Sequence, residues 1–142
     1  MKISARNVFE GSITALVDGK VNAEVEITTP GGDRIVAVVT EDSVQSLGLI
    51  VGKPAMALVK APWVIVVTDD SGVKLSARNQ LAGTVQHIEK GAINSEIGIK
   101  LVGGTLVYAV ITNEAVMELG LKPGAPATAL IKASHVVIGV RD

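Results

Sequence analysis

A small set of hydrogen-bond donors occurs twice in this chain of 142 residues, at a constant spacing of 72 positions. Each copy contains a serine, an arginine, a threonine and a lysine. The four pairs are Ser4 and Ser76, Arg6 and Arg78, Thr40 and Thr112, and Lys60 and Lys132. An arginine offers directional N–H donors, a lysine offers a compact positive charge, and hydroxyl groups complete the hydrogen bonding of the remaining oxygens. This combination predicts a site for a tetrahedral oxyanion.

Two further serines that fit the same chemistry occur in one copy only. Ser43 aligns with Ala115, and Ser134 aligns with Pro62. Thr40 and Ser43 bracket an expected helix start, where free backbone N–H groups favour an anion. These departures predict that the two halves do not build identical pockets.

Each of these donors also has an ordinary structural explanation when it is taken alone. Arg6 can be a surface residue of a strand, Lys60 can cap a turn, and Thr40 can serve only as the N-cap of its helix. The two copies have diverged at most surface positions and have nevertheless kept these residues. Their joint retention favours the oxyanion site over the separate explanations.

A second candidate set surrounds an asparagine that follows a glycine-containing turn. Asn22 and Asn94 occupy the same position of the two copies, three residues after Gly19 and Gly91. Asparagine close to glycine is common turn chemistry. The alternative is a turn close to an assembly axis, where several copies of the chain present backbone N–H groups and asparagine amides to one anion. The residues alone leave both interpretations open.

The sequence predicts no catalytic centre, no cofactor and no directly coordinated metal. The two histidines, His87 and His135, align with Ala15 and Trp63, so a site repeated with the module would use neither of them. The chain contains no cysteine and none of the HExxH, GxSxG, P-loop or GxGxxG patterns. Trp63 is expected to pack in a core or in an interface. We therefore expect a protein that is not an enzyme.

The repeat extends over the whole chain, and residues 1–70 align with residues 73–142 without a gap. A period of this length indicates a duplicated domain, so we expect two modules with those boundaries, joined by Ser71 and Gly72. The hydrophobic content is 48% and the mean hydropathy is +0.45, which is high for modules of this size. The apolar surface is therefore expected to be buried between the halves, between chains, or both.

Both halves have the same pattern of β-strand signals. Alternating apolar and polar residues, separated by turn residues, predict five strands in the first half, at 3–16, 21–28, 34–39, 55–59 and 64–68. Thr40 as an N-cap and Gly48 as a stop delimit a short helix between the third and fourth strands. Five strands with a helix in that place are typical of an OB-fold. The predicted fold is all-β, with two tandem OB-fold-like five-stranded barrels and one short helix in each.

Charge and composition argue against several other functions. The net charge is −1, which gives no general attraction to nucleic acid or to an anionic membrane. An OB-fold that binds nucleic acid needs a basic groove with stacking aromatic residues, and the aromatic residues here are only Phe9, Trp63 and Tyr108. No apolar run approaches the roughly 18 residues of a membrane span. The N-terminus lacks the apolar core of a signal peptide, so a cytoplasmic location is expected.

Several short motifs resemble those of one family. Ser-Ala-Arg-Asn-x-x-x-Gly, Val-Asn-Ala-Glu, Leu-Gly-Leu and Leu-Val-Lys-Ala-Pro-Trp-Val are similar to the Mop domains of molbindins, which bind molybdate. The resemblance covers the whole chain, twice, and is greatest to the two-domain (di-Mop) molbindins. Similar domains form the ligand-sensing part of the molybdate-responsive transcription regulator and a C-terminal appendage of molybdate transporter ATPases. This sequence contains neither a helix-turn-helix segment nor an ATPase, so only the binding function is expected to carry over.

The resemblance implies modules that assemble six at a time, which for a two-module chain means a homotrimer. It also implies two classes of oxyanion site at module interfaces. The first class would use Ser4, Arg6, Thr40, Ser43, Lys60, Ala61, Ser76, Arg78, Thr112, Lys132, Ala133 and Ser134. The second class, around the threefold axis, would use Val21, Asn22, Ala23, Ile93, Asn94 and Ser95. In the first class, the serine and arginine of one module are expected to complete the threonine and lysine of another.

The expected function is storage and homeostasis of molybdate in the cytoplasm, by a protein that binds the intact anion. Each buried dianion should meet about two positive groups, which one arginine and one lysine provide. Tungstate should bind almost equally well, and selection over sulfate would have to come from cavity size. The alternative is a regulatory or assembly module that acts on a partner protein when it binds the anion.

Overall fold

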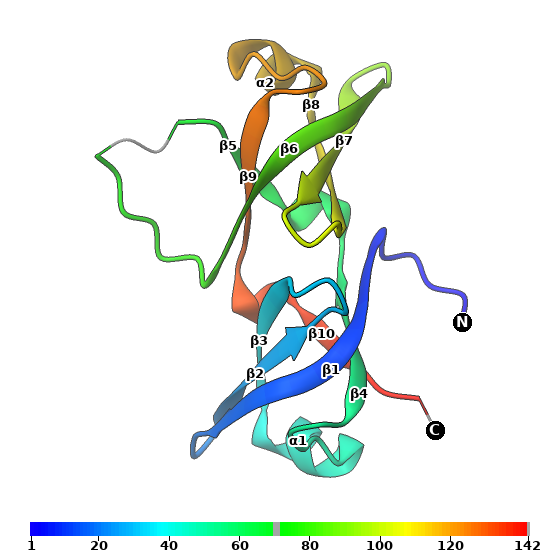
Figure 1. The fold of residues 1–142 in the computed structure, drawn as a ribbon, viewed down its shortest axis with the longest axis vertical. Helices are drawn as coiled ribbons and strands as arrows, with labels where there is room; N and C mark the ends of the chain where they lie inside the picture. The colour runs from blue at the N-terminus through cyan, green and yellow to red at the C-terminus, as the bar shows by residue number, and fades with distance from the viewer. Residues whose placement is uncertain (70–71, 142) are drawn as a thin grey trace.

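A computed structural model of the chain describes residues 1–69 and 72–141. The predicted module ends at Asp70 and Asp142, and the predicted linker residue Ser71, lie outside the described residues. The described residues form two five-stranded antiparallel sheets, which lie end to end along the long axis of the molecule (Figure 1). A short helix lies at each end of that axis.

Each sheet contains four strands of one repeat. The first sheet has β1 (Asn7–Asp18), β2 (Asn22–Thr28), β3 (Arg34–Thr40) and β4 (Pro54–Val59), with helix α1 (Glu41–Leu47) between β3 and β4. The second sheet has β6 (Asn79–Lys90), β7 (Asn94–Leu101), β8 (Leu106–Thr112) and β9 (Pro126–Ile131), with helix α2 (Asn113–Glu118) between β8 and β9. The predicted fold class, all-β with a helix between the third and fourth strands of each repeat, is confirmed.

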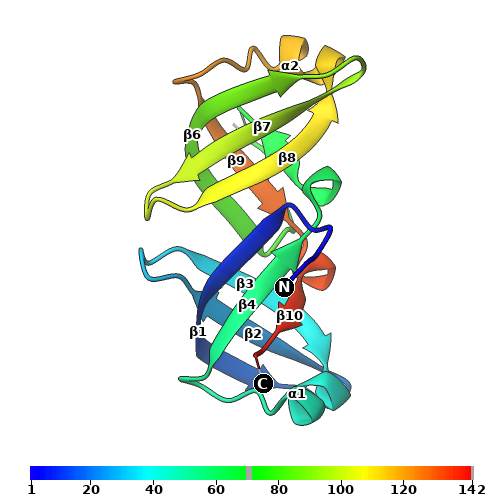
Figure 2. The ribbon, with the colours of Figure 1, turned by 90° about the vertical axis from the view of Figure 1, so that its right-hand side faces the viewer.

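The fifth strand of each sheet comes from the other repeat. β5 (Ile65–Val67) pairs with β9. β10 (Val137–Gly139) pairs with β4, beside which it lies in Figure 2. The sheet orders are β10-β4-β1-β2-β3 and β5-β9-β6-β7-β8. This exchange differs from the expectation of five consecutive strands in each barrel. Both copies of the strand pair in equivalent registers, so either copy fits the edge of either sheet.

Short 3-10 turns carry the chain from one sheet to the other. The turn η1 (Ala61–Trp63) follows β4 and packs against β8, and the turn η2 (Ala133–His135) follows β9 and packs against β3. Ala61 and Ala133 are only 3% and 5% exposed, and a larger side chain at either position would have to displace its neighbours. Each repeat therefore places its last turn next to the third strand of the other repeat.

Local sequence explains the elements that carry the candidate residues. In β2 buried residues alternate with more exposed ones, as its period-two pattern predicts. The hydroxyl oxygen of Thr40 accepts a hydrogen bond from the N–H of Ser43 at the start of α1, and Gly48 ends this helix with a φ of 63°. β1 begins at Asn7, later than the predicted residue 3, and Arg6 immediately before it contacts Glu96 and Tyr108 of the second repeat.

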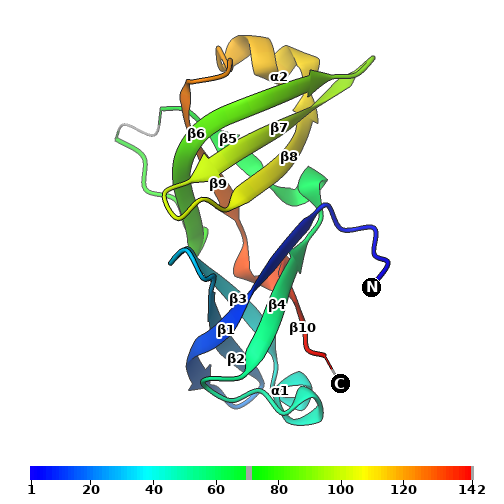
Figure 3. The same ribbon diagram turned by 45° about the vertical axis from the view of Figure 1, so that its right-hand side comes forward.

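Two buried asparagines join the repeats. The side chain of Asn7 donates to the carbonyl of Tyr108 at 2.8 Å and accepts from the N–H of Tyr108 at 2.7 Å. Asn79 makes the equivalent pair with Val36 at 2.8 and 2.7 Å, and it also donates to the carbonyl of Ile131. The start of β1 lies at the junction of the two sheets (Figure 3). These bonds fix the position of the arginine that precedes each asparagine.

One hydrophobic core extends through both repeats. It includes Val25 and Ile27 of β2 and their counterparts Ile97 and Ile99 of β7, all of them fully buried. The two halves therefore bury apolar surface against each other, which agrees with the high hydropathy of the sequence.

Candidate functional site

An open groove of about 360 Å³ brings together predicted site residues of both repeats. Asn22, Thr40 and Ser43 come from the first repeat, and Ser134 comes from the second. The strand exchange creates this combination, because η2 packs against β3. Ser134 was expected among the residues of the second repeat, and the structure places it with Thr40 and Ser43 instead.

Two hydroxyl groups of this groove, those of Thr40 and Ser43, are joined by hydrogen bonds. Thr40 Oγ1 accepts from the backbone N–H of Ser43 at 3.1 Å and donates to Ser43 Oγ at 2.9 Å. The hydroxyl proton of Ser43 can therefore be donated to a ligand. In the second repeat Thr112 Oγ1 accepts from the backbone N–H of Ala115 at 3.1 Å. Because the second repeat has Ala115 where the first has Ser43, it lacks the terminal hydroxyl of this hydrogen-bonded series.

The predicted threonine and lysine residues are combined across the two repeats. Lys132 is the residue immediately before η2, and the groove residue Ser134 lies within that turn. Lys60 holds the equivalent place before η1, which packs against β8. Both lysines are exposed. The backbone of each lysine thus adjoins a turn that packs against the third strand of the other repeat.

The two predicted classes of site lie next to each other in each sheet. Asn22 faces Thr40 across β2 and β3, and Asn94 faces Thr112 across β7 and β8. A residue of the predicted axis class is therefore directly opposite a residue of the predicted interface class. In the groove, Asn22 and Thr40 line one and the same hollow.

The neighbours of the two asparagines point in different directions. Val21 and Ile93 are 73% and 74% exposed, whereas Ala23 and Ser95 are each 2% exposed. The hydroxyl of Ser95 donates to Asn113. The side chains of Ala23 and Ser95 therefore face the protein interior, and only their backbone groups remain as candidates for an anion.

The turns that precede the two asparagines differ in charge. In the first repeat, desolvation raises the pKa of Glu41, and a hydrogen bond with Asp18 raises it further. The equivalent positions in the second repeat hold Asn113 and Lys90. An anion at the first turn would meet a carboxyl pair, and an anion at the second turn would meet a cation.

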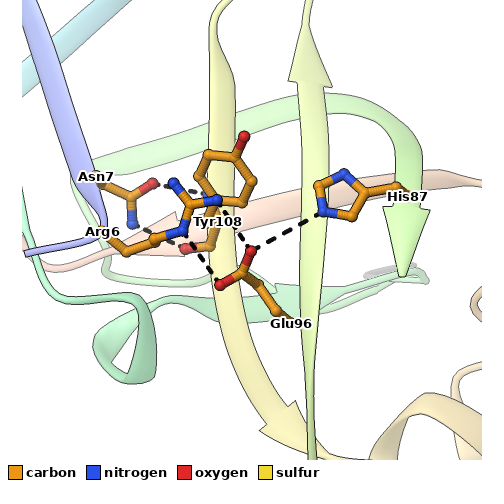
Figure 4. Close-up of polar contacts among 5 residues, drawn as sticks. All are labelled: Arg6, Asn7, His87, Glu96 and Tyr108. Atoms are coloured by element: carbon orange, nitrogen blue, oxygen red, sulfur yellow. Dashed lines mark hydrogen bonds and ion pairs between the residues drawn. The ribbon is translucent and has the colours of Figure 1, made fainter. Parts of the chain in front are cut away.

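Each predicted arginine binds a glutamate of the other repeat. Nε and Nη2 of Arg6 donate to Oε2 and Oε1 of Glu96 at 3.2 Å each, and the guanidinium carbon lies 3.7 Å from the centre of the Tyr108 ring (Figure 4). Arg78 forms the same two hydrogen bonds with Glu24. Hydrogen bonding to the arginine lowers the pKa of Glu24 below its ordinary value, against the opposing effect of desolvation.

The two glutamates are absent from the set of predicted site residues. Glu24 and Glu96 occupy the same place in the repeated segments Val-Asn-Ala-Glu and Ile-Asn-Ser-Glu. Their conservation between the copies was therefore visible in the sequence. The alternation of apolar and polar residues along β2 accounts for a polar residue at this position, so the pattern alone indicates no specific role for it.

The Arg78–Glu24 pair lies beside the groove. Glu24 faces Val38 across β2 and β3, two residues from the pair formed by Asn22 and Thr40 and on the same side of the strand. Val38 lines the groove. The register of β7 and β8 places the Arg6–Glu96 pair equivalently in the second sheet.

The remaining predicted residues lie near these elements. Ser4 and Ser76, two residues before the arginines, are exposed. Trp63 and His135, which align in the repeats, form a tilted ring contact with centroids 5.1 Å apart. Trp63 is 44% exposed, so its packing partner is the equivalent residue of the other repeat rather than the deep core.

No group of three or more His, Cys, Asp or Glu residues that could hold a metal ion is found in residues 1–69 and 72–141. The helices of the same ranges are too short or too polar to cross a membrane.

A family model for the TOBE domain matches residues 3–66 and 75–138. The chain belongs to the TOBE domain family. The two matches correspond to the two repeats, so the molecule has two tandem TOBE modules. The resemblance to two-domain molbindins is confirmed.

Curated relatives of this TOBE protein have names that refer to molybdenum. It is 43% identical over 142 residues to the molybdenum transport protein ModE of Herbaspirillum seropedicae. This match covers 100% of this chain and 53% of that protein. It is 40% identical over 140 residues to the molybdenum-pterin-binding protein MopA of Rhodobacter capsulatus. This match covers 99% of this chain and 53% of that protein. The chain thus spans about half the length of these relatives.

A solved structure matches this TOBE protein over its full length. The match is to the cytoplasmic molybdate-binding protein ModG, in a crystal form with molybdate bound. The sequence identity is 59% and the TM-score is 0.94, and the match covers 99% of this chain and 100% of that chain.

Proposed function

We propose that this chain binds molybdate as an intact oxyanion and stores it reversibly in the cytoplasm. The observation that carries the proposal is the likeness, over the full length of both chains, to a cytoplasmic molybdate-binding protein with molybdate bound. The groove that contains Asn22, Thr40, Ser43 and Ser134 supports it, because each of these side chains can donate a hydrogen bond to an oxyanion oxygen. Tungstate, with the same charge and shape, is proposed as a second ligand.

Each proposed interface site combines residues of both repeats. An arginine and a lysine from one repeat meet the threonine of the other, and they supply about two positive charges for one dianion. The first site consists of Thr40, Ser43, Ser76, Arg78, Lys132, Ala133 and Ser134. The second site consists of Ser4, Arg6, Lys60, Ala61 and Thr112. The proposed axial sites use the turns at Asn22 and Asn94.

We propose that three copies of the chain assemble and present six modules. Large apolar side chains are exposed on a single chain, including Val21 at 73%, Ile93 at 74% and Met117 at 79%. Val21 and Ile93 precede the two asparagines of the proposed axial sites. Contacts between copies would remove this apolar surface from water.

Binding needs neither catalysis nor a cofactor in this proposal. The anion is held by hydrogen bonds and charge, and no protein atom binds the molybdenum itself. Sulfate has the same charge and shape, so its exclusion depends on the size of the cavity. The protein therefore acts as a reversible reservoir for the anion.

We expect the two interface sites to differ in affinity. The strand exchange collects three hydroxyl groups in the first groove, from Thr40, Ser43 and Ser134. The aligned positions in the second sheet are Thr112, Ala115 and Pro62. Because two hydroxyl donors are missing there, the second site is expected to bind the anion more weakly.

Isothermal titration of sodium molybdate into the protein alone tests this proposal. We expect saturable binding in more than one phase. The double variant Ser43→Ala, Ser134→Pro copies the residues of the second site, and it is expected to lose the tighter phase and to keep the weaker one. Absence of binding without a partner would contradict storage. A variant with an unchanged tight phase would show that the hydroxyl residues are wrongly assigned.

A regulatory module that responds to the anion is the second candidate. The observation that favours it is that several relatives are named as transcriptional regulators, including ModE of Yersinia pestis, and that this chain spans 52% of that protein. In that case the anion would change the affinity for a partner protein. The same titration separates the candidates, because a module that needs its partner would bind molybdate only in its presence.

A further inference from the structure

Both arginines of the proposed oxyanion sites already carry a carboxylate counter-ion. Arg6 binds Glu96 through two hydrogen bonds of 3.2 Å, and Arg78 binds Glu24 through the same two guanidinium nitrogens, Nε and Nη2. The arrangement occurs twice, at equivalent positions of the two repeats. Each arginine comes from one repeat and its glutamate from the other. The ion pairs therefore join the two repeats, as the groove does.

The location of the glutamates makes this pairing relevant to anion binding. Glu24 lies on the same side of β2 as Asn22, and its cross-strand neighbour Val38 lines the groove. A dianion in the groove would therefore lie close to the carboxylate as well as to the guanidinium. The pair of Arg78 and Glu24 has no net charge, and Lys132 is then the only uncompensated cation in the proposed site.

We infer that Glu24 and Glu96 are counter-ions that hold the arginines in the anion-free protein and compete with the oxyanion for them. This inference rests on the proposed function, since it takes Arg6 and Arg78 as anion ligands. When the anion binds, it meets the guanidinium against the repulsion of the carboxylate. The glutamates thus lower the affinity to a level at which the stored anion can be released.

The two pairs differ in what else holds the arginine. Arg6 lies over the ring of Tyr108, and Nε2 of His87 is 3.9 Å from Oε1 of Glu96 (Figure 4). Tyr108 aligns with Val36, and His87 aligns with Ala15. Arg6 therefore keeps an aromatic contact when its glutamate is replaced. For this reason Glu96→Gln separates the charge of the glutamate from its effect on the position of the arginine.

The test compares four full-length proteins by isothermal titration with sodium molybdate. They are the native chain, Glu96→Gln, the double variant Glu24→Gln with Glu96→Gln, and the control Glu118→Gln. Glutamine keeps a hydrogen-bond acceptor for the arginine and removes the charge. Glu118, at the end of α2, lies outside the proposed sites, and its replacement gives the same change in net charge as Glu96→Gln.

We expect Glu96→Gln to tighten the weaker phase of molybdate binding about tenfold relative to the native chain, and the double variant to tighten both phases about tenfold. Glu118→Gln is expected to bind like the native chain. Unchanged or weaker binding by the glutamine variants, or an equal gain in the control, would overturn the inference and leave the proposed function intact.

The remaining outcomes also separate the two claims. Binding by the glutamine variants without binding by the native chain would support the inference and overturn the proposed function. Binding by none of the four proteins would overturn both.

Discussion

Replacement of Asn79 by alanine is expected to lower the free energy of unfolding by about 3 kcal/mol. Asn79 is 2% exposed, and its side chain bonds both backbone groups of Val36 and the carbonyl of Ile131. Alanine leaves these buried groups without the partners they have now, and water cannot replace them without entering the junction of the sheets. The loss acts on the contact between the two repeats as well as on each sheet.

Urea unfolding followed by circular dichroism measures this effect. Asn7→Ala is expected to show a smaller loss, because Asn7 makes two such bonds where Asn79 makes three. Asn94→Ala is a matched control, since Asn94 is exposed, and it should change the stability by less than about 0.5 kcal/mol. A loss of less than about 1 kcal/mol for Asn79→Ala would show that the asparagine bonds do not hold the repeats together.

The double variant Arg6→Ala, Arg78→Ala is expected to weaken molybdate binding at the interface sites by at least about 100-fold. Each site loses a charged hydrogen-bond donor. The glutamate that this donor compensated then faces the dianion alone. The side chains of Arg6 and Arg78 are 50% and 56% exposed, so their ion pairs contribute little to folding. The assembly of the chain is therefore expected to survive.

Titration calorimetry and light scattering after size-exclusion chromatography measure the two properties separately. Arg34→Ala serves as a control, because Arg34 is an exposed arginine at the start of β3 and lies outside the proposed sites. An unchanged number of bound anions in the double variant would show that the arginines are not ligands. Loss of the assembled state would show instead that they hold the copies together.

Much of the fold could be predicted because local rules determine it. The alternation of β2 and the cap residues Thr40 and Gly48 depend on neighbours within a few residues. The strand exchange depends on a choice between two nearly identical edges. Ile65 faces Leu130 where Val137 faces Leu58, so neither sequence nor register distinguishes the strand of one repeat from that of the other. On the exchanged path η1 packs against β8 and η2 packs against β3.

The candidate site was only partly predictable for the same reason. Asn22 and Thr40 were found from their repetition, and Ser43 and Ser134 from the chemistry that they share with the repeated donors. That Ser134 lies with Thr40 and Ser43 follows only from the strand exchange. The sequence pattern does not single out Glu24 and Glu96, since a polar residue on the outer side of a strand needs no special explanation. Their role depends on Arg78 and Arg6, which approach from the other repeat.

We propose that the oxyanion binds where the two repeats meet. Crystals grown with sodium molybdate, with diffraction data collected at the molybdenum absorption edge, test it most directly. An anomalous peak is expected within hydrogen-bond distance of the side chains of Thr40, Ser43 and Ser134. No anomalous peak, or peaks only at positions away from both repeats' third strands, would contradict it.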